Sequence, residues 1–258
     1  MGWQCLFAAA GCGPDYFRYN YSVSTPLLIA HRGNSSVALE NSLEAVHAAL
    51  ALPADMIELD IRRSRDNVLY IMHDKTTART AGNDIDIERS LSGEIEKVRL
   101  KNGEPVPTLT DVIKVIAGKS GLNLELKSDG AGLPTAEFLA SSDYKGYVLV
   151  SSFNEDEVLS VRRMMPRLPV SLIFDVFAAN DAPSYKERGY NIISLRKTTA
   201  NERLIASCHE QGIQVYVWTV DEEDEMKKFI SRGVDGIYSN KPAMLKKLLS
   251  AGCGACPV

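Results

Sequence analysis

Two carboxylates stand two positions apart in the apolar run Met56 to Asp60 (MIELD). Alternate residues of a strand point to the same side, so Glu58 and Asp60 face the same way. Like charges repel each other when they are buried, unless a cation neutralises them. Glu125, near the end of another apolar run, offers a third carboxylate. Three carboxylates suit one hard divalent cation, Mg²⁺ or Ca²⁺, better than zinc, and the alternative is a structural network of charges.

Two of the four histidines, His31 and His73, end predicted strands. An imidazole titrates near neutral pH and can act as a general acid or as a general base. His47 and His209 lie within predicted helices, where ordinary surface or interface positions are expected. His31 and His73 are therefore the candidate catalytic pair.

Two cations follow the same strands. Arg32 presents a fork of N–H donors that matches two oxygens of a phosphate, and Lys127 adds a second positive charge beside the third carboxylate. Arg62, Arg63 and Arg65 also follow a strand, but their position in a polar turn favours a solvated surface. Together, the histidines, carboxylates and cations favour cleavage of a phosphodiester, in which one group deprotonates the nucleophile and another protonates the leaving alcohol.

The elements that must position these side chains repeat regularly in the second half of the chain. Short β-rich apolar runs, each followed by a loop and a helical stretch, start roughly every 21 to 26 residues. Continuous apolar runs are typical of parallel strands buried on both faces, and strand–helix alternation indicates βα units. The runs are 121–126, 147–151, 170–174, 191–195, 214–218 and 235–238.

The first half adds strand candidates at 27–31, 56–60 and 68–72, which makes nine where a closed barrel needs eight. The linker between the last two is too short for a helix. Either this pair is an excursion of one barrel wall, or the final run at 235–238 is a minor strand.

Two helices and a long loop complete the first half. A helix is expected over 41–52, with Asn41 as its N-cap and Glu44 completing a capping box, and another begins at Thr108. Residues 74–107 contain several glycines and prolines but no clear βα unit. A loop of this length within a compact domain is usually functional, so we expect a mobile flap or small insertion near the active face.

The length of 258 residues and the βα pattern predict a single α/β domain, a TIM-type (β/α)8 barrel. We expect the barrel over 25–250, an N-terminal tail over 1–24 and a C-terminal tail over 251–258. Barrels of this type place their catalytic groups at the carboxyl ends of the strands. The candidate histidines, carboxylates and cations lie at four consecutive strand ends and are expected to converge on one patch.

The composition narrows the class of partner. The formal net charge is −4, and the lysines and arginines do not cluster, which argues against nucleic acid but not against a small phosphorylated ligand. No apolar run reaches the roughly 18 residues of a membrane span, so no stable membrane insertion is expected. The N-terminus has no clear signal peptide, and a cytoplasmic location is expected. The five cysteines are an odd number, and four of them lie in the tails, which does not favour a disulfide scaffold.

Taken in order, these residues resemble the signature of the glycerophosphodiester phosphodiesterase family. The resemblance covers about residues 27 to 245 and includes every candidate strand end. Its motifs are His31-Arg32-Gly33, Glu40-Asn41, Glu58-Leu-Asp60, His73-Asp74, Pro107-Thr108-Leu109, Asn123-Leu-Glu125-Leu-Lys127, Ser151-Ser152-Phe153, Val217-Trp218-Thr219 and Gly233-Val-Asp-Gly236.

The resemblance implies a TIM barrel that uses one divalent cation, Mg²⁺ or Ca²⁺. It implies hydrolysis of small glycerophosphodiesters, such as glycerophosphocholine or glycerophosphoethanolamine, to glycerol 3-phosphate and an alcohol. It also implies a role for each matching residue: His31 and His73 as the catalytic pair, Glu58, Asp60 and Glu125 as metal ligands, and Arg32, Lys127, Trp218 and Glu40 as substrate-binding residues.

Some positions carry a weaker assignment. Trp218 is expected to line the substrate cleft, and Glu40 is an acid near the site without a defined role. Leu39 stands where the family usually has proline, and Asn240 stands where it often has aspartate. Neither departure is expected to touch the strand ends, so both concern the substrate pocket rather than the chemistry.

Two alternatives stay open. Sphingomyelinase D-like and phosphoinositide-specific phospholipase C enzymes also place two histidines and a cation on such a barrel, but they act on intact lipids. A barrel that binds a phosphorylated metabolite without turnover is the second alternative. The sequence does not fix the head group, the native metal, the acid and base roles of the histidines, or the oligomeric state.

Overall fold

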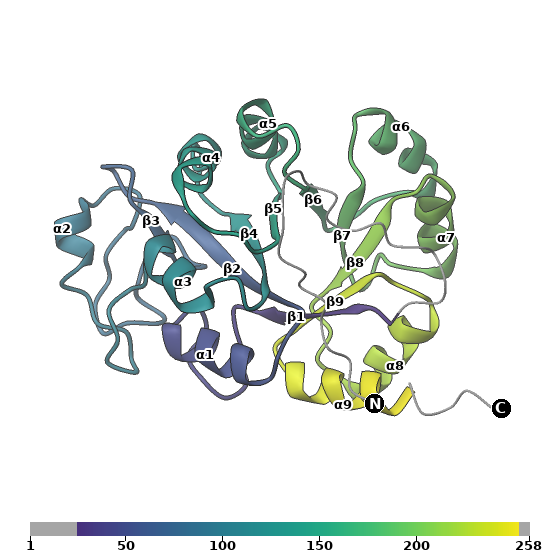
Figure 1. The fold of residues 1–258 in the computed structure, drawn as a ribbon, viewed down its shortest axis with the longest axis horizontal. Coiled ribbons are helices and arrows are strands. Elements are labelled where there is room, and N and C mark those ends of the chain that lie inside the picture. The colour runs from purple at the N-terminus through teal and green to yellow at the C-terminus, as the bar shows by residue number, and fades with distance from the viewer. Residues whose placement is uncertain (1–24, 253–258) are drawn as a thin grey trace.

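The chain folds as a closed barrel of parallel strands surrounded by helices, and the computed structural model describes residues 25–252 (Figure 1). The strands are β1 (Leu27–His31), β2 (Met56–Arg63), β3 (Leu69–Ile71), β4 (Gly121–Leu126), β5 (Val148–Ser152), β6 (Val170–Phe174), β7 (Ile192–Arg196), β8 (Gln214–Trp218) and β9 (Gly236–Ser239). Neighbouring barrel strands are parallel, and β1 pairs with both β2 and β9, which closes the ring. The predicted TIM-type fold is confirmed.

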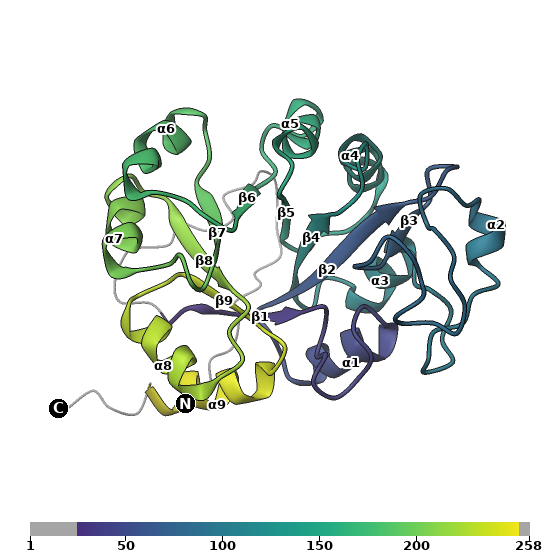
Figure 2. The ribbon, with the colours of Figure 1, turned by 180° about the vertical axis from the view of Figure 1, so that it is seen from behind.

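Helices fill most of the connections and lie on the outside of the strands in both views (Figures 1 and 2). They are α1 (Leu43–Ala51), α2 (Ser92–Ile95), α3 (Leu109–Ile116), α4 (Gly132–Ser141), α5 (Glu155–Met164), the short 3₁₀ helix η1 (Ala179–Asp181), α6 (Ala182–Glu187), α7 (Glu202–Glu210), α8 (Glu223–Ser231) and α9 (Pro242–Gly252).

The surplus strand is β3. It pairs antiparallel with β2, with Tyr70 opposite Arg62, and so extends one wall of the barrel rather than closing it. By contrast, β9 is a barrel strand that pairs with β1 on one side and β8 on the other. Of the two alternatives for the nine strand candidates, the excursion is therefore confirmed.

The barrel has an outer and an inner apolar layer. Outward-pointing side chains such as Ile57, Leu124 and Val217 are fully buried against the helices. Inward-pointing side chains such as Ile29 and Tyr216 form a smaller cluster inside the barrel. Each large apolar side chain buried in this way stabilises the fold by about 1.5–3 kcal/mol. Polar residues follow the inner cluster at the carboxyl ends of the strands.

The turn between β1 and α1 is built around close contacts. Gly33 has a φ of +79°, and a Cβ there would lie 2.7 Å from the carbonyl carbon of Ala45, so the turn requires glycine. The N-cap of α1 is Ser42, whose hydroxyl accepts from the N–H of Ala45 at 3.0 Å. The prediction of Asn41 as the cap was wrong, because its amide instead donates to Oδ2 of Asp60 at 2.8 Å.

Two helix starts show how acidic groups satisfy free N–H donors. At α1 the carboxylate comes from Glu104, which accepts from the N–H groups of Leu43 and Glu44 at 2.9 and 3.1 Å, so the predicted role of Glu44 was also wrong. At α3, Thr108 and Asp111 form a reciprocal capping box, and the helix start predicted at Thr108 is confirmed.

Residues 74–107 form a compact unit beside β3 and α3, at the edge of the barrel (Figure 1). The unit contains α2 and shares a hydrophobic cluster with the end of the excursion. The members of this cluster are Tyr70, Met72, Ala81, Ile87, Ile95, Val98, Leu100 and Val106. The segment is therefore packed as a small insertion, and its mobility stays a prediction.

Among the described residues, none of the helices has both the length and the hydropathy needed to cross a membrane. Cys208 is a buried free thiol, whereas Cys5, Cys12, Cys253 and Cys256 lie outside the described residues, as do most of the two predicted tails.

Candidate active site

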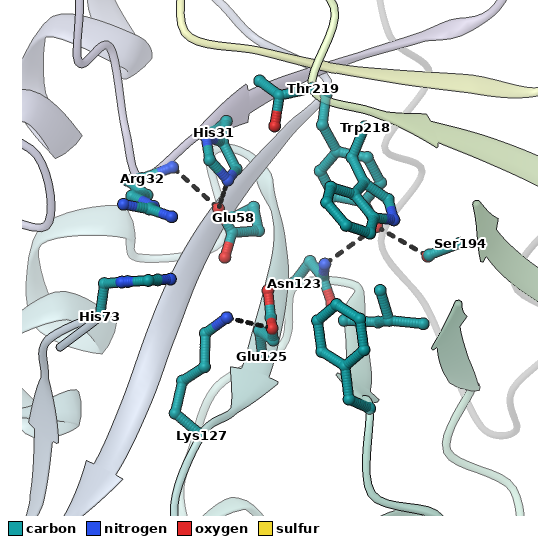
Figure 3. A pocket seen from close by; sticks show the side chains of 13 residues that line it. His31, Arg32, Glu58, His73, Asn123, Glu125, Lys127, Ser194, Trp218 and Thr219 are labelled. Carbon is teal, nitrogen blue, oxygen red and sulfur yellow. Dashed lines mark hydrogen bonds and ion pairs between the residues drawn. The ribbon is translucent and has the colours of Figure 1, made fainter. Parts of the chain in front are cut away.

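A cavity of about 170 Å³ lies at the carboxyl ends of the barrel strands (Figure 3). Seven of the nine predicted site residues line it: His31, Arg32, Glu58, His73, Glu125, Lys127 and Trp218. Of the other two, Asp60 is fully buried beside Arg32 and Lys127, and Glu40 lines an adjoining hollow. The predicted convergence of four strand ends is therefore observed.

The three carboxylates meet at this end of the barrel. The register between β2 and β4 pairs Asp60 with Glu125, and one oxygen from each of Glu58, Asp60 and Glu125 lies within 4.8 Å of the others. All three side chains are buried. Within residues 25–252, Oε1 of Glu58 has no hydrogen-bond partner, which is uncommon for a buried oxygen.

Burial and the proximity of the carboxylates to one another and to Arg32 and Lys127 shift their pKa values. Burial and the charge of Asp60 raise the pKa of Glu58 to about 8 and the pKa of Glu125 to about 7. Burial also acts to raise the pKa of Asp60, but Lys127 and Arg32 outweigh it and hold that pKa below its usual value. Near neutral pH the cluster therefore holds protons that a bound cation would displace.

These features fit a divalent cation. A cation would give Oε1 of Glu58 the partner that it lacks among the described residues, and its positive charge would lower the raised pKa values of Glu58 and Glu125. Carboxylate oxygens are the protein ligands that Mg²⁺ and Ca²⁺ prefer. The residues that could hold the ion are Glu58, Asp60 and Glu125.

His31 is oriented by a chain of hydrogen bonds within the barrel. Its Nδ1 lies 2.7 Å from Oδ1 of Asn240, whose amide nitrogen donates to Oδ2 of Asp221 at 2.7 Å. Because the carboxylate of Asp221 can only accept, the amide of Asn240 must present its oxygen to the ring. His31 therefore carries its proton on Nδ1 and directs Nε2 toward Glu58, 3.8 Å from Oε2. Burial and the charge of Arg32 lower the pKa of His31, which favours the neutral ring.

His73 has a charged partner instead. Its Nδ1 lies 2.7 Å from Oδ1 of Asp74, and its carbonyl oxygen accepts two hydrogen bonds from the guanidinium of Arg62, at 2.9 and 2.7 Å. Burial lowers the pKa of His73, and the charge of Asp60 and the hydrogen bond to Asp74 oppose that shift. The expectation of a solvated Arg62 was wrong, because its side chain is only 12% exposed and also bonds to Glu88 at 2.6 Å.

Arg32 sits where the carboxylates can hold it. Its backbone N–H donates to Oε2 of Glu58 at 2.8 Å, and its Nη1 donates to Oε1 of Glu40 at 2.8 Å. Its Nε lies 3.3 Å from Oδ2 of Asp60. Glu40 thus contacts the guanidinium that lines the cavity, rather than lining that cavity itself.

Lys127 and two aromatic rings form the opposite wall. The ammonium of Lys127 bonds to Oε1 of Glu125 and lies 3.4 Å from Oδ1 of Asp60. It also lies 5.7 Å from the ring centre of Phe153, which packs edge-on against Trp218 at 5.6 Å. Figure 3 shows Trp218 across the cavity from Arg32 and His73. Phe153 belongs to the Ser151-Ser152-Phe153 motif, but no pattern in the sequence places its ring at the site.

The inner floor of the cavity is a hydrogen-bonded set of neutral side chains. The amide of Asn123 donates to the hydroxyl of Tyr238 at 3.0 Å, and that hydroxyl lies 3.3 Å from Oγ of Ser194. Ser151 donates to the amide oxygen of Asn123 at 3.0 Å. In the sequence, these residues could be found as polar side chains at inward-facing positions of otherwise apolar strands.

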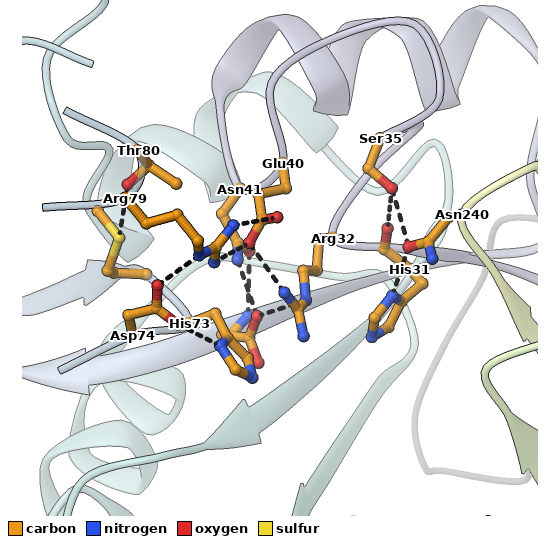
Figure 4. Close-up of polar contacts among 12 residues, drawn as sticks. His31, Arg32, Ser35, Glu40, Asn41, His73, Asp74, Arg79, Thr80 and Asn240 are labelled. Carbon is orange, nitrogen blue, oxygen red and sulfur yellow. Dashed lines mark hydrogen bonds and ion pairs between the residues drawn. The ribbon is translucent and has the colours of Figure 1, made fainter. Parts of the chain in front are cut away.

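Sequence reasoning also missed residues that hold the site from outside. The expectation that Asn240 leaves the strand ends untouched was wrong, because it bonds to His31. Leu39 lines the adjoining hollow with Glu40. Arg79, from the 74–107 segment, bonds to both Glu40 and Asp74 (Figure 4). Its exposed position in an irregular loop offered no pattern to find it by.

The chain is similar over most of its length to known phosphodiesterases. Residues 31–244 match the model of the glycerophosphoryl diester phosphodiesterase family. A glycerophosphodiester phosphodiesterase of Caldanaerobacter subterraneus subsp. tengcongensis is 32% identical over 241 residues, which cover 88% of this chain and 98% of that protein. One from Bacillus subtilis is 24% identical over 251 residues, which cover 86% of each chain.

Solved structures share the fold. A phosphodiesterase of Oleispira antarctica, solved in complex with the product sn-glycerol-3-phosphate, has a TM-score of 0.82 and 24% identity. The match covers 88% of this chain and 97% of that one. The family match, the relatives and the barrel agree with the chemistry of the cavity. The chain is an enzyme that belongs to the glycerophosphoryl diester phosphodiesterase family.

Proposed function

We propose that the protein hydrolyses small glycerophosphodiesters, such as glycerophosphocholine and glycerophosphoethanolamine, to glycerol 3-phosphate and an alcohol in a metal-dependent reaction. The observation that carries this proposal is the cluster of three buried carboxylates that shares one cavity with two histidines and two cations. Each of these groups has a separate task in cleaving a phosphodiester.

The carboxylates Glu58, Asp60 and Glu125 hold one divalent cation, Mg²⁺ or Ca²⁺. When bound, the ion supplies Lewis-acid stabilisation of the charged phosphate oxygens. Support for this assignment comes from the raised pKa values of Glu58 and Glu125, since these groups give up protons most readily when a positive charge arrives.

Arg32 and Lys127 bind the phosphate from two sides. The bonds from Arg32 to Glu40 and from Lys127 to Glu125 hold both charges at the cavity wall before substrate arrives. Charges that are already oriented need no reorganisation as negative charge develops in the transition state. Trp218 and Phe153 then offer an apolar surface to the carbon chain of the substrate.

His31 and His73 move the protons. One imidazole accepts the proton of the attacking hydroxyl or water, and the other donates a proton to the leaving alcohol. Each ring is held at Nδ1, by Asn240 or by Asp74, which leaves Nε2 as the nitrogen available for proton transfer. General acid–base catalysis of this kind contributes about 10²–10⁴-fold.

The size of the cavity supports a small substrate. Its volume of about 170 Å³ is below the roughly 300–1,000 Å³ that pockets for drug-sized ligands provide. A compact, polar diester suits this space, which adjoins a more open hollow of about 560 Å³ that shares His31 and Arg32.

The test is release of glycerol 3-phosphate from glycerophosphocholine and glycerophosphoethanolamine, with Mg²⁺, Ca²⁺ or excess EDTA. We expect release with at least one metal and none in EDTA. Glu58→Gln provides the matched variant, and calorimetry should show weaker binding of the same metal. No release with any metal, from folded protein, would contradict the proposal, and lipid vesicles would then be the substrate to test.

A further inference from the structure

Arg79 links two neighbouring carboxylates, Glu40 and Asp74, beside the active site (Figure 4). Its Nη1 and Nη2 donate to the two oxygens of Glu40, both at 2.7 Å, and its Nε donates to Oδ2 of Asp74 at 2.5 Å. All three nitrogens of one guanidinium are therefore used. A planar fork of this kind fixes the orientation of its partners more strictly than a single ion pair does.

Each of these carboxylates in turn holds a group that lines the cavity. Oε1 of Glu40 accepts from Nη1 of Arg32 at 2.8 Å. Oδ1 of Asp74 lies 2.7 Å from Nδ1 of His73. Two short chains of contacts thus start at Arg79, and one ends at the proposed phosphate-binding guanidinium while the other ends at a proposed acid–base group.

The backbone that carries Arg79 is firmly packed. Thr77 and Thr80 are buried, and the N–H of Ala81 donates to the carbonyl of Thr77 at 2.8 Å. The hydroxyl of Thr80 lies 3.2 Å from Sδ of Met72. The carbonyl oxygen of Thr80 accepts from the N–H of Lys101 at 2.8 Å. The 74–107 segment therefore gives Arg79 a fixed base, although its side chain is 47% exposed.

Stability alone does not explain the arrangement. Exposed ion pairs contribute on the order of 0–1 kcal/mol, so a half-exposed arginine is a weak anchor for a segment that has its own apolar core. Its contacts, however, all go to residues that touch Arg32 or His73.

We propose that Arg79 is a positioning residue, which fixes the guanidinium of Arg32 and the imidazole of His73 in one shared arrangement. This inference rests on the function proposed for those two residues. It also gives the 74–107 segment a function. The segment supplies Arg79, which sets the position of the guanidinium of Arg32 relative to the imidazole of His73.

The kinetic test compares Arg79→Ala with Arg89→Ala. Arg89 lies in the same segment, is 81% exposed and pairs only loosely with Asp86, at 3.7 Å. Arg79→Ala should lower kcat/KM about 10- to 100-fold, by analogy with the loss that follows removal of a residue that orients a metal ligand. Arg89→Ala should match the wild type. Arg79→Lys should recover little, because an ammonium cannot make all three bonds.

Chemical rescue separates positioning from a structural role. Free guanidinium, at a concentration far below that which unfolds the protein, should restore part of the activity of Arg79→Ala. It should not change the activity of Arg89→Ala. Unchanged kcat/KM in Arg79→Ala, or a loss that guanidinium does not relieve, would overturn the inference.

A spectroscopic measurement keeps this inference distinct from the proposed function. Histidine side-chain ¹⁵N signals can be assigned by substitution, since the chain has only four histidines. In Arg79→Ala the signals of His73 should move, whereas those of His47, which lies exposed on α1, should stay. Inactive wild-type protein would reject the proposed substrates, and the histidine signals would still decide whether Arg79 orients His73. Unmoved signals of His73 would overturn that role.

Discussion

His31 and His73 line the same cavity, but two different parts of the molecule hold them. His31 ends β1, and its support consists of Asn240 and Asp221, which follow the neighbouring strands β9 and β8. His73 follows the excursion strand β3, and its support includes Asp74 and Arg79, from the segment inserted between β3 and α3. The barrel thus orients one histidine and the insertion orients the other.

The two supports also differ in charge. A neutral amide oxygen, that of Asn240, accepts the hydrogen bond from Nδ1 of His31, whereas a carboxylate, that of Asp74, lies at Nδ1 of His73. A carboxylate stabilises an imidazolium and an amide oxygen does so far less. The ring of His31 is therefore set up as neutral, and that of His73 can tolerate a charge more easily. The difference indicates that the orientation and the charge of each imidazole are set by its own support, independently of the other imidazole.

The largest expected effect comes from removing either ring. His31→Ala and His73→Ala should each lower kcat by about 10²–10⁴-fold, because each removes one of the two proton transfers. Measurement of kcat with glycerophosphocholine at saturating metal checks this. His47→Ala is the control, since His47 lies exposed on α1. Near-normal turnover in either active-site variant would refute the paired mechanism.

The next effect separates the two supports. Asn240→Ala and Asp74→Ala should each lower kcat/KM about 10- to 100-fold, because each ring loses the bond that orients it. Adding Arg79→Ala to Asp74→Ala should cost less than adding it to Asn240→Ala, since Arg79 and Asp74 belong to the same chain of contacts. Double-mutant cycles measure this coupling. Equal costs in both backgrounds would mean that the two supports are not separate.

The sequence predicted the groups that do chemistry better than the groups that hold them. Glu58, Asp60 and Glu125 could be found because reactive side chains interrupt apolar strands, and the barrel rule says where strand ends meet. Asn240 stands far from His31 in the chain, and only closure of the ring by β9 brings the two together. Arg79 could not be found, because an irregular loop has no periodicity from which to read direction.

The errors at α1 and Arg62 have a common cause. Asparagine and serine are about equally good N-caps, so local preference could not choose between Asn41 and Ser42. Tertiary structure decided, because Asp60 takes the amide of Asn41. In the same way, Arg62 occupies a turn that looks solvated, but the insertion covers it with Glu88. Local patterns predict elements well, but contacts between distant segments change the tasks of single residues.

A third prediction concerns the carboxylate cluster, where the two supports meet. In the metal-free protein the pKa values of Glu58 and Glu125 stand above their usual value, at about 8 and about 7. At these two carboxyls the folded form therefore binds more protons than the unfolded form, and their contribution to the free energy of unfolding should fall as pH rises from about 4.5 to about 8. The lowered pKa values of His31 and His73 act in the opposite direction, so the comparison with a variant isolates the carboxyls. Excess EDTA in chemical denaturation reveals this dependence.

The matched measurement uses Glu58→Gln, whose side chain does not titrate. Its free energy of unfolding in EDTA should fall less over that pH range, and the difference from the wild type should exceed about 1 kcal/mol near pH 8. Bound metal should flatten the slope of the wild type, because the cation stabilises the ionised carboxylates. Parallel slopes for the two proteins in EDTA would contradict the raised pKa of Glu58.

The smallest effect tests whether the insertion is a flap or part of the barrel. Ile87 lies in the core of the 74–107 segment and Ile57 in the barrel core, and both are fully buried. The segment core includes Tyr70 of β3, which pairs with β2, so we expect the two regions to unfold together. Ile87→Val and Ile57→Val should then each lower the free energy of unfolding by about 0.5–1.5 kcal/mol. If Ile87→Val instead leaves global stability unchanged and only speeds amide exchange within the segment, the insertion moves on its own. His73 would then depend on a mobile support and His31 on a rigid one.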